Sequence, residues 1–258
     1  MSTQIIGLHD WLQTPAGQYL LEWESAQLDE AVSDIFGYHA LQLGVPELDG
    51  LRANRMPHQW LATEVLPPAG NVPQRRVALL TDFAALPFSA SSLDLVVLPH
   101  TLEFSADPHA TLREVERVLV PEGRVVICGL NPVSLWGLRQ RRARVYRRLK
   151  FGSLFLPDSG GFIGYWRLRD WMRLLGLEVE AGHFGCYRPA VNNAKWLRRF
   201  EWMDTVGPRW WPILGAAYFL VAVKRVRGMR LLGPAWAGAS ARVRKSVPVA
   251  NRSHKSGQ

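Results

Sequence analysis

The chain has 258 residues, 48% of them hydrophobic and 21% charged, which is typical of a globular protein with one α/β domain and some additions. No apolar run is long enough to span a bilayer, the start lacks a secretion signal, and the two cysteines, Cys128 and Cys186, favour reduced structural thiols. We therefore expect a cytoplasmic protein. Residues 1–138 carry seven basic and sixteen acidic side chains, whereas residues 139–258 carry twenty-four basic and six acidic. This asymmetry favours a polyanionic partner or a membrane surface for the back half, with solvated surface charge as the alternative.

The N-terminal segment, residues 1–37, is predicted to be helical. Thr14 followed by Pro15 is a typical helix start, and Gly37 is a typical end. Acidic side chains, Glu24 among them, are expected on the exposed side. The apolar stripe on the opposite side consists of Leu21, Leu28, Val32 and Ile35.

Three short apolar runs predict the first strands of a sheet, over residues 39–44, 58–64 and 77–81. A loop with three prolines, residues 67–74, separates the last two runs.

The next fifty residues predict a strand, a helix and a strand. Residues 93–98 are continuously apolar, as in a strand covered on both faces. Asp107 is a helix N-cap with Pro108 at the first helical position, and Glu114 and Arg117 are expected away from the apolar face of that helix. Residues 121–123 turn the chain into a strand over 124–129. A strand, helix and strand in this order form the crossover unit of a parallel sheet.

The back half is basic and aromatic. We predict a basic helix over residues 133–150, a hinge at Gly160 and Gly161, a helix over 167–175 and a strand over 177–181. An insertion rich in tryptophan and arginine, residues 185–211, precedes a last strand over 217–223. Residues 231–258 form a basic tail that we expect to be disordered.

The central stretch resembles the class I S-adenosylmethionine-dependent methyltransferases, in particular the small-molecule and quinone-methylating enzymes. The resemblance implies an α/β fold over residues 38–230, a Rossmann-like seven-stranded sheet with helices on both faces, an antiparallel last strand and the aromatic and basic insertion before it. It depends on Asp82, Leu86, Pro87, Phe88, Leu93, Asp94, Val96, Asp107, Pro108, Leu112, Glu114, Arg117, Val118, Leu119, Pro121 and Gly123.

The resemblance also implies where the cofactor S-adenosyl-L-methionine binds. Gly44 would let the backbone approach the amino-acid portion, although residues 45–47 (Val, Pro and Glu) stand where the family has further glycines, so this first motif is degenerate. Glu64 would bind the ribose hydroxyls. Asp82 would accept from the adenine amino group, with capping of a turn as its alternative role, and Phe83 would border the ring.

Pro99 and His100, at the end of the fourth strand, would also line the cofactor cleft. His100 is the candidate catalytic residue, as a proton acceptor from the substrate, with a purely structural hydrogen bond as the alternative. No metal site is expected.

These residues together predict a methyltransferase acting on a small acceptor, of a planar or lipid-like kind if the aromatic insertion contacts it. The insertion could equally be a bulky core under a loop. The alternative function is a catalytically silent protein that binds a membrane surface or RNA through residues 139–150 and the tail, which would place it peripherally at the membrane.

Overall fold

The computed structural model describes residues 7–65, 77–148, 154–157 and 161–225, and they contain a seven-stranded sheet in the order β3-β2-β1-β4-β5-β7-β6. The strands β3, β2, β1, β4 and β5 pair in parallel, while β7 is antiparallel to both β5 and β6. This arrangement confirms the predicted Rossmann-like sheet. The strands are β1 (His39–Leu43), β2 (His58–Thr63), β3 (Leu79–Leu80), β4 (Leu93–Pro99), β5 (Leu119–Leu130), β6 (Leu177–Gly185) and β7 (Ala217–Lys224).

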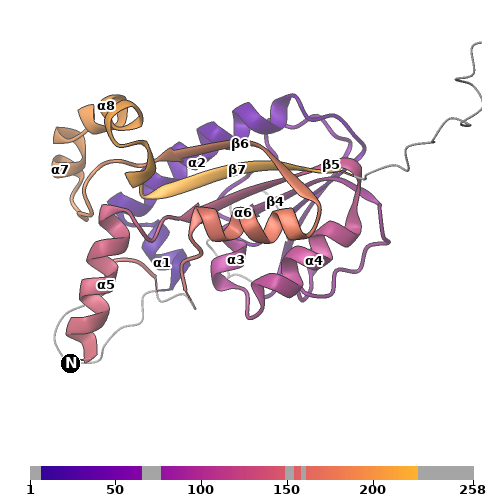
Figure 1. Cartoon of the computed structure of the whole chain (residues 1–258), viewed down its shortest axis with the longest axis horizontal. Coiled ribbons are helices and arrows are strands. Elements are labelled where there is room, and N and C mark those ends of the chain that lie inside the picture. The colour runs from indigo at the N-terminus through magenta and orange to yellow at the C-terminus, as the bar shows by residue number, and fades with distance from the viewer. Residues whose placement is uncertain (1–6, 66–76, 149–153, 158–160, 226–258) are drawn as a thin grey trace, which may run out of the picture. The chain divides into compact units, whose positions relative to one another are not determined.

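Helices cover both faces of the sheet (Figure 1). The side chains of α1 and α2 pack in one core cluster with Val97, Val126 and Phe219, and those of α4 and α6 pack in a second cluster with Val96, Ile127 and the opposite face of the sheet. The helices are α1 (Leu8–Leu12), α2 (Pro15–Ser33), α3 (Thr101–Phe104), α4 (Pro108–Val118), α5 (Leu135–Arg148), α6 (Tyr165–Leu174), α7 (Ala194–Arg199) and α8 (Trp202–Trp210), with a short 3-10 helix η1 (Pro212–Leu214) before β7.

The helix starts follow from the capping residues that the sequence predicts. The Thr14 hydroxyl accepts from the Gly17 N–H at 3.2 Å, and Pro15 occupies the first turn of α2, where a missing N–H costs nothing. The Asp107 carboxylate accepts from two N–H groups of α4, each at 3.0 Å. Local sequence therefore fixes where both main helices begin.

Several segments differ from the prediction, and the predicted turn at residues 121–123 lies within β5. The third strand has two residues, because pairing with β2 stops at Leu80. The aromatic insertion forms two helices, α7 and α8, and Asn193 caps the first of them. Residues 44–57, between β1 and β2, form turns and contain no helix.

Residues Met1–Val226 form one compact unit, and the N-terminal helices contribute to the main core. The predicted tail, residues 231–258, lies outside the described residues. In the part of the chain that the structure describes, no helix is both long and apolar enough to cross a membrane.

Candidate functional site

The carboxyl ends of β1, β3 and β4 meet at Gly44. Its φ of +76° lies in the left-handed region that favours glycine. A Cβ at this position would lie 3.5 Å from the Thr101 hydroxyl oxygen and 3.8 Å from the Phe83 ring. The edge of the sheet therefore brings together residues from three loops that are far apart in sequence.

The loop after β1 is held from inside the protein by Gln42, which is fully buried. Its side-chain Nε2 donates to the carbonyls of Gly44, Val45 and Leu48 at 3.2, 3.0 and 2.6 Å, and its Oε1 accepts from the Gly50 N–H at 2.9 Å. This amide satisfies four backbone groups that a helix would otherwise pair.

The residues that stand where the family has further glycines take part in this turn. Val45 is buried at a φ of +38°, a strained conformation for a β-branched residue. Glu47 contacts the His9 ring from α1. The contacts around Val45 therefore hold its backbone in this strained conformation.

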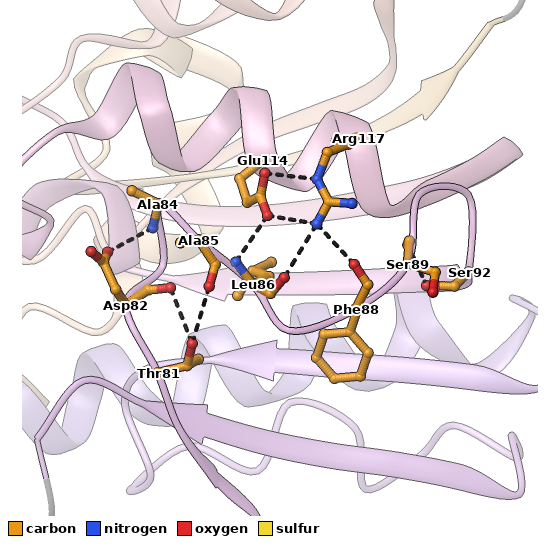
Figure 2. Close-up of polar contacts among 10 residues, drawn as sticks. All are labelled: Thr81, Asp82, Ala84, Ala85, Leu86, Phe88, Ser89, Ser92, Glu114 and Arg117. Atoms are coloured by element: carbon orange, nitrogen blue, oxygen red, sulfur yellow. Dashed lines mark hydrogen bonds and ion pairs between the residues drawn. The ribbon is translucent and has the colours of Figure 1, made fainter.

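Asp82 and Glu64 lie together at the ends of β3 and β2. The exposed Asp82 accepts at Oδ1 from the Ala84 N–H at 2.8 Å, which is the turn-capping role (Figure 2). In the described part of the chain nothing bonds to its other oxygen. The Glu64 carboxylate is 3.5 Å from the N–H of Phe83, whose side chain is buried. One acceptor oxygen of Asp82 is therefore available beside Phe83 and Glu64.

An ion pair on α4 fixes the loop that follows Asp82. Glu114 accepts from the Leu86 N–H at 2.9 Å, while Arg117 donates to the carbonyls of Leu86 and Phe88 at 3.2 and 2.8 Å and pairs with Glu114 at 2.6 Å (Figure 2). The hydrogen bonds from Arg117 hold the pKa of Glu114 below its usual value. Sequence reasoning placed both side chains away from the apolar face of α4, but did not find that they clamp this loop.

His100 lies in a buried cluster between two carboxylates. The imidazole is 1% exposed, with Nδ1 at 3.0 Å from Glu103 and Nε2 at 2.8 Å from Glu24, the latter without hydrogen-bond alignment. Glu24 was expected on the exposed side of its helix and that expectation is wrong, because it is fully buried. Its position four residues before Leu28 and eight before Val32 is the signal that could have shown it on the buried stripe.

The charges of this cluster are set by its burial and its carboxylates. Burial lowers the pKa of His100, but Glu24 and Glu103 outweigh this and raise it to about 10. Burial raises the pKa of Glu103. At neutral pH the imidazole is therefore protonated and has no lone pair for a substrate proton. Its role as a general base stays a prediction that this charge state does not favour.

Pro99 also lies at this carboxyl edge, whereas the groove of the molecule is lined by other residues. Pro99 is the last residue of β4 and is buried beside Cys128 of β5. A groove of about 280 Å³ lies between α2 and strands β5, β6 and β7, and none of the predicted cofactor residues lines it. Within the described residues no three histidine, cysteine, aspartate or glutamate side chains gather as metal ligands.

The sheet order, with an antiparallel β7 between β5 and β6, together with ligand-type residues at the carboxyl edge, defines the class I methyltransferase fold. Residues 61–127, which are less than half of the chain, match the family model described as the methyltransferase domain. The matched residues begin in β2 and end in β5, so Gly44 and its loop lie outside them.

Individual proteins are similar to this chain in sequence or in fold. The chain is similar to the uncharacterized protein YafS of Escherichia coli, with 29% identity over 247 residues that cover 95% of this chain and 92% of that protein. Among solved structures, an S-adenosylmethionine-dependent methyltransferase of Thermotoga maritima matches with a TM-score of 0.53 and 18% identity, covering 80% of this chain and 93% of that one. The [4+2]-cyclase SpnF matches with a TM-score of 0.51 and 16% identity, covering 81% and 82%. These two structures show the fold alone.

Proposed function

We propose that the chain binds S-adenosyl-L-methionine at the carboxyl edge of β1, β2, β3 and β4 and transfers its methyl group to a small acceptor. The observation that carries this proposal is the meeting of Gly44, the Glu64 carboxylate and the available oxygen of Asp82 at that edge. These acceptor groups suit a nucleoside, since carboxylates accept hydrogen bonds from hydroxyls and from an exocyclic amine.

Each residue of the edge has a distinct task in the proposed site. Asp82 would accept from the adenine amino group and Glu64 from the ribose hydroxyls, while Phe83 borders the ring. Gly44 leaves room for the amino-acid portion, and Pro99 and His100 form the floor. When bound, the cofactor supplies an electrophilic methyl group on a sulfonium.

The protein's own contribution to the reaction is alignment and exclusion of water. Methyl transfer from a sulfonium needs little acid or base assistance once the acceptor is positioned. A protonated His100 is consistent with this, because it holds α2 and α3 against β4 rather than removing a proton. The acceptor is of a planar or lipid-like kind, which the exposed tryptophans of α7 and α8 favour.

Isothermal titration of the full chain with S-adenosyl-L-methionine tests the proposal. Asp82→Asn keeps an oxygen for the Ala84 N–H but can present an amide donor to the adenine, and we expect it to weaken binding about tenfold or more. Asp82→Ala should do at least as much. Asp170→Ala, at another exposed aspartate on α6, is the matched control and should bind normally. Equal affinity in the Asp82 variants would remove that residue from the site.

A second candidate function is a catalytically silent protein that uses its basic half to bind a membrane or RNA. The turns at residues 44–57 favour it, because no glycine-rich loop and helix follow β1. The fold likeness to SpnF, described as a [4+2]-cyclase, is consistent with a methyltransferase-like fold in a protein named for another reaction. Absence of heat with millimolar S-adenosyl-L-methionine would contradict the first proposal and support this one.

A further inference from the structure

We infer that one end of the molecule docks on an anionic lipid bilayer, through a surface formed by residues 133–146 of the α5 region and 194–214 of the α7, α8 and η1 region. We call this the arginine–tryptophan surface. The inference makes specific the membrane partner raised above, and it does not require the chain to bind S-adenosyl-L-methionine.

Exposed apolar side chains gather on this surface. Among the described residues, ten of the sixteen large hydrophobic side chains that are exposed belong to its two segments. The principal ones are Leu138, Val145, Tyr146, Trp196, Trp202 and Trp210, and Trp210 is 73% exposed. Single exposed apolar residues are normal, but a concentration of them marks an interaction site.

An apolar stripe on α5 is part of this exposure. Leu138 and Val145 lie seven residues apart on one face of the helix and are 55% and 58% exposed, while the buried residues of the helix include Trp136 and Gln140. This apolar face of α5 therefore points to solvent.

The same surface is positively charged. Its two segments contain eight basic residues and two acidic ones. Both acidic residues, Glu201 and Asp204, already contact Arg188 at 3.6 and 2.8 Å. Arg141 and Arg142 are exposed, are within one helical turn of Leu138 and Val145, and form no ion pair with the described part of the chain. Arginines flanking apolar side chains suit the boundary between anionic headgroups and acyl chains.

Both segments contact the same intervening stretch, residues 187–190. Trp136 on α5 donates from Nε1 to the Arg188 carbonyl at 2.8 Å, and Arg139 contacts the Ala190 carbonyl. Asp204 on α8 accepts from the Tyr187 N–H at 3.0 Å. In Figure 1, α5, α7 and α8 lie at the same end of the molecule. The two segments are therefore held together and form one surface.

The side chains of the arginine–tryptophan surface favour a bilayer as its partner over a nucleic acid or a second copy of the chain. A nucleic-acid backbone would pair with the arginines but gives the aliphatic side chains of α5 no apolar partner. A second copy of the chain would bring the same net positive charge to a two-fold contact and be repelled. Tryptophan and tyrosine beside arginine are the side chains that settle at a lipid–water boundary.

Vesicle flotation of the full chain tests the inference, with phosphatidylcholine alone and with added phosphatidylglycerol. We expect binding only with the anionic lipid. Arg141→Gln with Arg142→Gln should weaken partitioning about 30-fold, since each basic residue near such a surface contributes about 1 kcal/mol. The control pair, Arg113→Gln with Arg173→Gln, removes the same charge elsewhere and should leave partitioning nearly unchanged.

The apolar contribution is tested separately. Replacing Trp196, Trp202 and Trp210 by alanine should reduce flotation about tenfold or more, whereas Trp166→Ala, at an exposed tryptophan of α6, should not. Equal flotation of the surface variants and their controls would overturn the inference. Failure on vesicles together with tight binding of single-stranded RNA would overturn it in favour of a nucleic-acid surface.

Discussion

The two loops that would face a nucleoside are held in opposite ways. The loop after β1 is fixed from inside the protein by the buried amide of Gln42, and the Thr101 hydroxyl that binds the Leu43 carbonyl adds a second buried contact beside it. The loop after β3 is fixed from outside by Glu114 and Arg117 on α4, whose side chains are 15% and 39% exposed. The half of the edge after β3 is held by a surface pair, and the half after β1 depends on buried polar groups.

This difference between the two loops predicts which substitutions reduce the stability of the protein most. Removing a buried polar partner leaves other buried groups without hydrogen bonds, which costs far more than removing an exposed ion pair. The largest losses of stability are therefore expected at the ends of β1 and β4, and the smallest at α4.

His100→Gln should have the largest effect, about 3–5 kcal/mol of the free energy of unfolding, because it removes the positive charge between two buried carboxylates. The double variant with Glu24→Gln should be less destabilised than the single one, since it removes a charge from both sides. Urea unfolding measures both. A double variant less stable than His100→Gln would contradict this account.

The same cluster predicts a pH dependence. The pKa of His100 is raised from 6.5 to about 10, so its stabilising contribution is fully present below pH 6.5 and is lost as the pH rises through about 10. His100→Gln should flatten this alkaline decline in stability. An unchanged pH profile would show that the imidazolium does not cause it.

Gln42→Leu should follow, with a loss of about 3 kcal/mol, because the side chain keeps its approximate volume but removes four buried hydrogen bonds to the loop. Gln27→Leu, at a half-buried glutamine of α2, is the control and should change stability little. Urea unfolding again gives the comparison. If the two variants are equally stable, water replaces the amide and the loop does not depend on it.

Arg117→Ala should have the smallest effect, about 1 kcal/mol, since the side chain is partly exposed and solvent weakens the pair. The pKa of Glu114 is lowered, so the contribution of the pair is present above the usual carboxylate pKa and is lost as the pH falls. Unfolding of the variant below pH 4.5 should therefore approach that of the wild type. Arg113→Ala is the control on the same helix.

The sheet and its main helices could be predicted from sequence, because capping residues and continuous apolar runs act locally. The starts of α2 and α4 follow from Thr14 and Asp107, and β4 and most of β5 follow from their own apolar runs. The short β3 could not be predicted, because its length depends on where β2 stops pairing.

The candidate site was only partly predictable. Gly44, Glu64, Asp82 and Phe83 were named from the resemblance, and the structure places them near one another, although their part in binding a cofactor is a proposal. The clamp by Glu114 and Arg117 and the burial of Glu24 were missed. Both depend on which element faces which, and a charged residue within an apolar stripe is easily assigned to the solvent side.

The position of α2 has a consequence for synthesis of the chain. Its apolar stripe packs in one cluster with residues of β4, β5 and β7, including Phe219 and Val221. A ribosome makes β7 about two hundred residues after α2, so the native partners of the helix are incomplete until β7 has emerged. During that interval the apolar face of the helix is exposed to solvent. Molecular chaperones bind segments of this kind.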